Sequence, residues 1–208
     1  LSAKLLKLPL VFTYHTLYHN YSHYFPFGGN IGSTVIKYWS KRFCERCDLI
    51  IAPSLFVKKL IEKSGISRPI DVIPTSLQDI YFTNNNDPQW LKNKHGLSAR
   101  EKILIYVGRL GKEKNIPFLL DALELIVKEK PHIRLVIVGT GPEEKYLKYL
   151  CRQKELNRHV IFTGKVDDQD LLKYYSGADI FTFASQTETQ GLVIGEAKAS
   201  GLPIVSLY

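Results

Sequence analysis

The 208-residue sequence has no methionine, only three cysteines and no run of 18 apolar residues. Without such a run, no segment of the chain is suited to form a transmembrane helix. Its first residues, LSAKLLKLPLVF, also lack the apolar core and the small-residue cleavage site of a secretory signal. Because it starts at Leu1 and holds no methionine, we expect the chain to be a piece of a longer protein.

The cysteines Cys44, Cys47 and Cys151 do not form a disulfide framework, since their number is odd and only two are close together. This usage is typical of a reducing compartment, so we expect a cytoplasmic location. The pair in CERC could bind zinc, but a structural zinc site needs four ligands and there is no second pair. Two half-buried helix cysteines are the alternative that we favour.

Charge is unevenly distributed along the chain. The net charge is +8, with a pI of about 9.3, and the first 83 residues hold ten basic but only five acidic side chains. Such a balance favours an anionic partner, for example a nucleotide, a membrane surface or a nucleic acid. Nucleic acid is disfavoured because the sequence shows no zinc-finger or RNA-binding signature and no basic tail. With 45% hydrophobic residues the chain can build a core, so disorder is not expected.

From about residue 100 onward, short apolar segments alternate with segments of helical periodicity. The expected strands are KILIYV (102–107), IRLVIVG (133–139), VIFTG, DIFTFA and PIVSL. Strands that are apolar on both faces and alternate with helices predict a parallel, doubly wound α/β sheet.

The region before residue 84 repeats this pattern less completely. PLVFTYH, DLIIAPS and DVIP are expected strands, and the segments 33–47 and LFVKKLIEKSG are expected helices. The polar, turn-rich stretch 84–99 is expected to be a linker with one helical turn. The sequence therefore predicts an incomplete domain over 1–83, a linker over 84–99 and a second domain over 100–208.

Glycines and cations follow several of the expected strands. Arg109 comes just after the strand 102–107, Gly139 ends the next strand and Gly141 follows it, and Gly164 ends VIFTG and is followed by Lys165. Because ligands bind beyond the carboxyl ends of parallel strands, these residues are expected on one rim. VGTGP could present backbone amides to a phosphate. Taken alone, it is equally well a tight turn, and Arg109 with Lys114 could be solvated surface cations.

The carboxyl-terminal segment decides between these alternatives. TETQGLVIGEAKASGLPIV places Glu188 eight residues before Glu196 and resembles the Glu-x7-Glu signature of the retaining GT-B glycosyltransferases of family four. GRLGKEKNIPFLLDAL is similar to that family's diphosphate-binding turn, TYHT to its histidine strand, and VIPTS to its domain-crossing strand. The resemblance covers almost the whole chain, with the motifs in the family's order.

The resemblance implies a GT-B fold of two Rossmann-like domains with parallel sheets, here with the first domain and the end of the second incomplete. In such enzymes a nucleotide sugar lies between the domains. The catalytic residues that the resemblance implies are Glu188, Arg109, Lys114 and His15. The donor-binding residues that it implies are Gly108, Gly139, Gly141, Gly164, Lys165, Val166, Gln190, Gly191, Leu192, Val193 and Glu196. Arg109 and Lys114 would stabilise the charge that grows on the leaving phosphate, Glu196 would hold ribose hydroxyls, and no metal or other cofactor is implied.

The Thr-Gln-Gly after Glu188 is similar to that of lipid glycosyltransferases that glucosylate diacylglycerol. This similarity implies UDP-glucose as the donor, a lipid or glycan acceptor, and a peripheral location on the inner face of the membrane. The expected helix 33–47 carries Trp39, Phe43 and four cations, and could lie on an anionic membrane. A packed helix with a solvated basic face is the alternative.

Other interpretations remain open on the sequence alone. Two glutamates could indicate a glycosidase. In a retaining glycosidase, however, the two carboxyl groups lie about 5–5.5 Å apart across one bond, and a residue before a helix and a second one inside it need not meet that geometry. The DQD at 168–170 could bind a metal, but it opens an expected helix, where acidic residues cap free amides. His15, His19 and His23 could also bind a metal, although an aromatic loop near the substrate is favoured. A sugar-nucleotide epimerase of similar fold and a catalytically silent binding module are the alternative functions.

Overall fold

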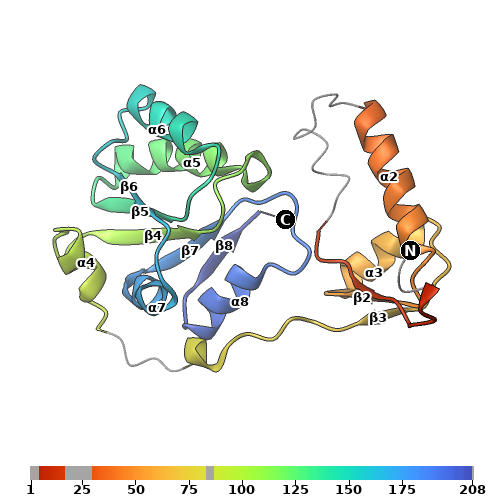
Figure 1. Ribbon diagram of the computed structural model, residues 1–208. Helices are drawn as coiled ribbons and strands as arrows, with labels where there is room; N and C mark the ends of the chain where they lie inside the picture. The colour runs from red at the N-terminus through yellow and green to blue at the C-terminus, as the bar shows by residue number, and fades with distance from the viewer. Residues whose placement is uncertain (1–4, 17–29, 83–86, 208) are drawn as a thin grey trace. The chain divides into compact units, whose positions relative to one another are not determined.

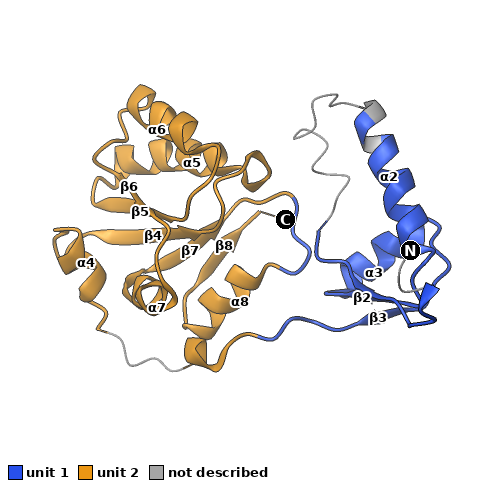
Figure 2. Ribbon diagram, viewed as in Figure 1, with its two compact units in different colours: residues 1–76, 187–190 blue, residues 77–186, 191–208 orange. Residues whose placement is uncertain are grey.

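The computed structural model describes residues 5–16, 30–82 and 87–207. The chain folds into two compact units (Figure 2). Unit 1 comprises residues 1–76 together with residues 187–190, and unit 2 comprises residues 77–186 and 191–208. The short segment 187–190 therefore belongs to a different unit from the residues on both sides of it.

Unit 2 is built on a five-stranded parallel sheet with the order β6-β5-β4-β7-β8. Its strands are β4 (Lys102–Val107), β5 (Ile133–Val138), β6 (Val160–Gly164), β7 (Ile180–Phe183) and β8 (Ile204–Ser206). In β4 and β5 nearly every side chain is buried or half-buried, as the continuous apolar runs predict. The parallel α/β sheet expected from the sequence is confirmed.

Helices cover both faces of this sheet. They are α5 (Ile116–Glu129), α6 (Glu144–Gln153), α7 (Asp168–Gly177) and α8 (Leu192–Ala199). Figure 1 shows α5 and α6 on one face and α7 and α8 on the other. The order of the strands reverses beside β4, so the carboxyl ends of β4, β5 and β7 meet at the point where such sheets usually bind ligands.

The expected linker contains a short helix that packs into unit 2. This helix, α4 (Trp90–Lys94), follows the 3-10 helix η2 (Asp79–Phe82). Its Leu91 is fully buried, and Trp90 contacts Tyr174 of α7 edge to face at 5.5 Å. Residues 87–99 of the expected linker are therefore part of this compact unit.

Unit 1 has a three-stranded parallel sheet with the order β1-β2-β3. The strands are β1 (Val11–Thr13), β2 (Leu49–Ala52) and β3 (Ile70–Val72), and they alternate with α2 (Asn30–Cys44) and α3 (Leu55–Lys63). The core of the unit includes Ile50, Val57, Ile61 and the buried cysteines Cys44 and Cys47. None of the helices in the described part of the chain combines the length and the apolarity needed to cross a bilayer.

Candidate active site

The rim of unit 2 is held together by three glycines at neighbouring strand ends. The Gly108 amide donates to Val138 O at 3.0 Å, and the Gly139 amide donates to Gly164 O at 2.9 Å. All three have positive φ, +152° at Gly108, +134° at Gly139 and +72° at Gly164. A Cβ on Gly139 would lie 2.0 Å from Gly108 O. Glycine at 139 thus allows two rim turns to approach closely, and its amide is already used within the protein.

Gly141 has a similar role on the same rim. A Cβ at this position would lie 2.3 Å from Leu110 O, and the Leu110 amide donates to Thr140 O at 3.0 Å. The turn that follows β5 therefore supports the turn that follows β4. Gly139 and Gly141 were expected to face the donor, and their visible role is to bring these two turns together.

The turn after β4 carries the two cations that the sequence singled out. Arg109 is exposed, while its carbonyl accepts a hydrogen bond of 3.1 Å from the Tyr106 hydroxyl. The 3-10 helix η3 (Lys112–Lys114) follows, and the half-buried Lys114 has its Nζ 5.8 Å from the centre of the Phe183 ring. The backbone of the turn is thus fixed, and Lys114 lies against the end of β7.

The loop after β7 is tied to the same turn. The Gln186 amide and the Ser185 hydroxyl both donate to Glu113 O, at 3.1 Å and 3.4 Å. Glu113 is the middle residue of η3. The segment that leads toward Glu188 therefore starts from the turn that carries Arg109 and Lys114.

Helix α8 presents the second glutamate. Gly191, with φ of +69°, opens the helix in a left-handed conformation. The first amides of a helix, here those of Leu192 and Val193, have no partner within it and can bind an anion. Glu196 is half-buried, and its Oε2 accepts a hydrogen bond of 2.9 Å from the Tyr175 hydroxyl. Burial raises the pKa of Glu196, while the hydrogen bond from Tyr175 opposes this rise.

The β6 end carries the remaining predicted residues of unit 2. Lys165, directly after Gly164, is exposed, and Val166 is half-buried and packs against the core. Thr163 Oγ1 donates to Gly164 O at 2.9 Å, which fixes the turn. Main-chain groups at this turn are candidates for contact with the nucleobase of the expected donor.

In unit 1 three strand ends meet the segment 187–190. His15 follows β1, Ser54 follows β2 and Thr75 follows β3, and each contacts Thr189 or Gln190 through a hydrogen bond. His15 is itself exposed, and Glu188 is half-buried. The structure therefore brings the predicted residues His15, Glu188 and Gln190 together within one unit.

Sequence reasoning missed Ser54, Thr75 and Tyr175. Ser54 had a local signal, because a serine before an apolar helical segment is a typical N-cap, and its Oγ does accept from the Val57 amide at 3.3 Å. Thr75 and Tyr175 had none, since their partners Gln190 and Glu196 lie 115 and 21 residues away.

The acidic residues at the start of α7 cap the helix and pair with lysines. Asp167 Oδ1 accepts a hydrogen bond of 2.8 Å from the Asp170 amide. The Asp170 carboxylate contacts Lys94 at 2.9 Å and Lys173 at 3.0 Å, and the hydrogen bond from Lys94 is the largest effect that lowers the pKa of Asp170. The cap is therefore Asp167, one residue before DQD, while Asp168 and Asp170 lie in the first turn, where acidic side chains interact favourably with the helix dipole.

Of the three histidines that the sequence singled out as possible metal ligands, only one lies in the described part of the chain. His19 and His23 lie outside the described residues, while His15 lies within them. Among the residues that the structure describes, no three His, Cys, Asp or Glu side chains are grouped closely enough to hold a metal ion.

The CERC cysteines are core residues of unit 1. Cys44 and Cys47 are fully buried, and burial raises the pKa of Cys44 to about 11. Thiols in such a setting stay protonated, and therefore behave as small apolar side chains.

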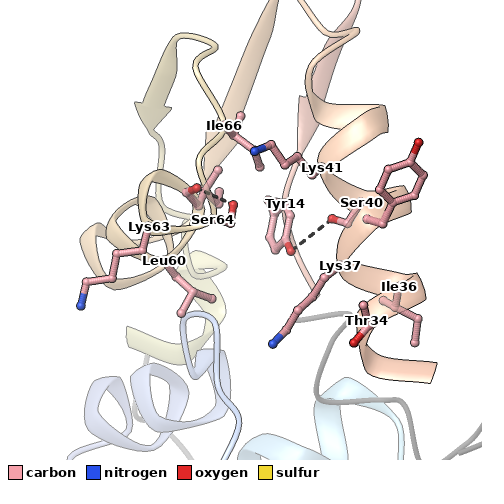
Figure 3. A pocket seen from close by; sticks show the side chains of 12 residues that line it. Tyr14, Thr34, Ile36, Lys37, Ser40, Lys41, Leu60, Lys63, Ser64 and Ile66 are labelled. Atoms are coloured by element: carbon pink, nitrogen blue, oxygen red, sulfur yellow. Dashed lines mark hydrogen bonds between the residues drawn. The ribbon is translucent and has the colours of Figure 1, made fainter. Parts of the chain in front are cut away.

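A pocket with a volume of about 480 Å³ lies between α2 and α3. Its walls include Leu60, Ile61 and Ile66, and the Tyr14 hydroxyl lies 3.5 Å from Ser40 Oγ inside it (Figure 3). Lys37, Lys41 and Lys63 also line the pocket, and Figure 3 shows Lys41 extending from α2 toward Ile66. The pocket is therefore apolar within and bordered by positive charge.

The sequence matches two glycosyltransferase families. Residues 89–207 match the family described as glycosyl transferases group 1, and residues 1–77 match glycosyltransferase family 4. The chain belongs to the glycosyl transferases group 1. In unit 2, the turn with Arg109 and Lys114 follows β4, and α8, which carries the half-buried Glu196, comes after the adjacent strand β7.

Relatives of this glycosyltransferase include two enzymes named alpha-monoglucosyldiacylglycerol synthase. The one from Streptococcus pneumoniae is 36% identical over 98% of this chain and 47% of its own length. The one from Acholeplasma laidlawii is 31% identical over 99% of this chain and 54% of its own length. The chain spans about half the length of these curated relatives.

A solved structure of HepE from Anabaena, in complex with UDP-glucose, has the same GT-B fold. Its TM-score is 0.82 at 22% identity, over 99% of this chain and 55% of that one. A sucrose-phosphate synthase from Thermosynechococcus elongatus matches with a TM-score of 0.79 at 24% identity, over 99% of this chain and 52% of that one. These comparisons confirm the fold that the sequence motifs implied.

Proposed function

We propose that the full-length protein is a retaining glucosyltransferase that transfers glucose from UDP-glucose to diacylglycerol. The observation that carries the proposal is in unit 2, where the turn with Arg109 and Lys114 follows β4, and α8, which carries Glu196, comes after the adjacent strand β7. These groups match the two phosphates and the ribose of a nucleoside diphosphate. The sequence identity of 36% and 31% to the two alpha-monoglucosyldiacylglycerol synthases, over nearly the whole chain, supports diacylglycerol as the acceptor.

Unit 2 binds the donor in this proposal. The Arg109 guanidinium makes a bidentate contact with two phosphate oxygens, and the Lys114 ammonium interacts with the phosphates as a point charge. The amides at the start of α8, those of Gly191, Leu192 and Val193, add the partial positive charge of the helix start. Glu196 accepts hydrogen bonds from the ribose hydroxyls through the oxygen that does not bind Tyr175. The turn at Gly164, Lys165 and Val166 holds the base through main-chain groups.

Unit 1 supplies the residues that act on the sugar. His15 and Glu188 contact hydroxyl groups of the glucose, and Glu188 stabilises the positive charge that develops at the anomeric carbon. An acceptor hydroxyl oxygen bonds to that carbon while its bond to the β-phosphate oxygen breaks. The acceptor proton passes to the leaving phosphate, which gives the glucoside and UDP. Because the cations neutralise charge that grows during this step, they stabilise the transition state more than the ground state.

The lipid acceptor requires access to a membrane, and α2 has the composition for it. Its exposed side chains include Tyr38, Trp39 and Phe43 beside Lys37, Lys41 and Arg42. Aromatic and basic residues together favour the surface of an anionic bilayer. We therefore propose that unit 1 docks peripherally on the membrane that supplies diacylglycerol.

A donor and acceptor panel tests this proposal. The full-length protein is incubated with labelled UDP-glucose or GDP-mannose, and with diacylglycerol vesicles, free sugars or no acceptor. Transfer of label from UDP-glucose to diacylglycerol supports the proposal. Epimerised UDP-sugar without transfer would identify an epimerase, and nucleotide binding without any turnover would identify a binding module; either result contradicts it.

A further inference from the structure

The segment Thr187–Gln190 leaves unit 2 for four residues and becomes part of unit 1. Chain connectivity alone does not explain this, because Gln186 and Gly191 on either side belong to unit 2. Specific side-chain contacts must therefore hold the segment. They come from Thr189 and Gln190, which directly follow Glu188.

Thr189 is held by the ends of two strands. Its carbonyl accepts a hydrogen bond of 2.7 Å from Ser54 Oγ, and its Oγ1 donates to His15 O at 3.1 Å. Ser54 Oγ also accepts from the Val57 amide as the cap of α3. Since this hydroxyl donates to one partner and accepts from another, its orientation is determined.

Gln190 is held by the end of the third strand through two hydrogen bonds. Its Oε1 accepts from the Thr75 amide at 3.0 Å, and its Nε2 donates to Thr75 O at 2.7 Å. The side-chain amide thus pairs with both backbone groups of one residue, as a neighbouring strand would. An amide side chain offers both a donor and an acceptor in this geometry, whereas an ionised carboxylate has no donor.

We propose that Gln190 is a positioning residue, whose paired hydrogen bonds with Thr75 fix the backbone that presents Glu188 to the sugar. The inference rests on the proposed function. It assigns to Gln190 a role through Glu188, in place of the direct donor contact expected from the sequence. Both polar atoms of the Gln190 side chain are engaged by Thr75, and Glu188 lies two residues before it.

Kinetics of three variants of the full-length protein test this role. Gln190→Ala removes both hydrogen bonds, and Gln190→Glu places a charge against Thr75 O. In both variants we expect kcat for glucose transfer to fall about tenfold, because the hydrogen-bond pair of Gln190 with Thr75, which fixes the backbone next to Glu188, is disrupted. The donor KM should stay within about twofold, since Arg109, Lys114 and Glu196 are unaffected. Gln186→Ala, an exposed glutamine of the same loop, should match the wild type.

A pH profile distinguishes positioning by the amide pair from general damage to the loop. A protonated carboxyl group has one donor and one acceptor, like an amide. The kcat of Gln190→Glu relative to wild type should therefore rise about twofold between pH 7 and pH 5, as the introduced group begins to protonate. The ratio for Gln190→Ala should stay constant. A wild-type kcat in Gln190→Ala, or an effect confined to the donor KM, would overturn the inference.

Hydrogen exchange tests the contact itself without any turnover. The Thr75 amide should exchange about tenfold faster in Gln190→Ala than in wild type, and at the wild-type rate in Gln186→Ala. Equal exchange at Thr75 in Gln190→Ala and wild type would show that the pair does not form, and would overturn the inference. Because this measurement needs no substrate, a failure of the proposed function and a failure of the Gln190 contact are distinguishable.

Discussion

The Tyr175 hydroxyl donates a hydrogen bond of 2.9 Å to Oε2 of Glu196, from one helix of unit 2 to another. Tyr175 is fully buried and packs between Tyr81 and Phe181, and burial raises its pKa. The hydroxyl therefore stays protonated and can serve only as a fixed donor to the carboxylate. In the function that we propose, this leaves the other oxygen of Glu196 for the ribose hydroxyls.

Tyr175→Phe should weaken donor binding without changing the chemical step. The hydrogen bond exists with and without the donor, so only the lost orientation of Glu196 affects binding; we expect the KM for UDP-glucose to rise about threefold, by less than the ~1.5–3 kcal/mol of the whole bond, with kcat nearly unchanged. Tyr149→Phe, at an exposed tyrosine of α6, is the matched control. A donor KM equal to that of wild type would show that Tyr175 has only a packing role.

Glu196→Gln should weaken donor binding but stabilise the fold at neutral pH. Since burial raises the pKa of Glu196 in the folded state, the protonated form is favoured by folding. The resulting stability is present below the unfolded pKa of about 4.3 and is lost as pH rises through the folded pKa. An uncharged amide avoids this loss.

Thermal unfolding at several pH values checks this prediction. The Glu196→Gln variant should have the higher midpoint at pH 7, and the difference from wild type should shrink as pH falls toward 4. The donor KM of the same variant should rise. A lower midpoint at pH 7 would indicate that the ionised carboxylate stabilises unit 2.

Arg109→Ala and Lys114→Ala should each weaken UDP binding by about 1.5–3 kcal/mol, as expected for hydrogen bonds to a charged group. Isothermal titration calorimetry with UDP measures the loss. Lys112→Ala is the control, because Lys112 is an exposed cation of the same turn. If all three variants bound UDP equally, Arg109 and Lys114 would be ordinary surface cations.

Glu188→Gln should lower kcat more than it raises the donor KM, because positive charge at the anomeric carbon develops only in the transition state. We expect no glucosyl group on Glu188 at any stage of turnover. Mass spectrometry of the protein, quenched during reaction with UDP-glucose, checks this point. A glucosyl adduct on Glu188 would assign it the role of a nucleophile.

Gly139→Ala should destabilise the protein by at least about 3 kcal/mol, because the added Cβ would lie 2.0 Å from a backbone oxygen. Gly201→Ala provides the comparison. Gly201 also has positive φ, +79°, but a Cβ there would meet nothing within 4 Å, so about 1 kcal/mol is expected. Urea unfolding measures both values, and similar losses would contradict the close approach of the two rim turns.

Local sequence patterns predicted the parts of the fold that depend on local chemistry. The strands of unit 2 are nearly continuous apolar runs, so β4 and β5 were visible in KILIYV and IRLVIVG. The one helical turn expected in the stretch 84–99 corresponds to α4, but its packing into unit 2 was not predicted, because a single buried leucine in a polar stretch gives no periodicity. Leu91 is buried against residues such as Gly177, where an added Cβ would lie 2.5 Å from Leu91 Cβ, and this partner is far away in the sequence.

The same distinction applies to the candidate site. Arg109, Lys114, Glu188 and Glu196 stand in motifs that a short window contains. The contacts of Gln190 with Thr75 and of Thr189 with His15 span 115 and 174 residues. Such pairs depend on how the strands of unit 1 are ordered, and no local pattern specifies that order.

The stereochemistry of the glucolipid tests the central claim most directly. The full-length protein is incubated with ¹³C-labelled UDP-glucose and vesicles that contain diacylglycerol and anionic lipid, and the product is examined by NMR. We expect glucosyldiacylglycerol whose anomeric carbon keeps the α configuration of the donor, together with one equivalent of UDP. A β-linked product, or UDP released without any glucolipid, would contradict it.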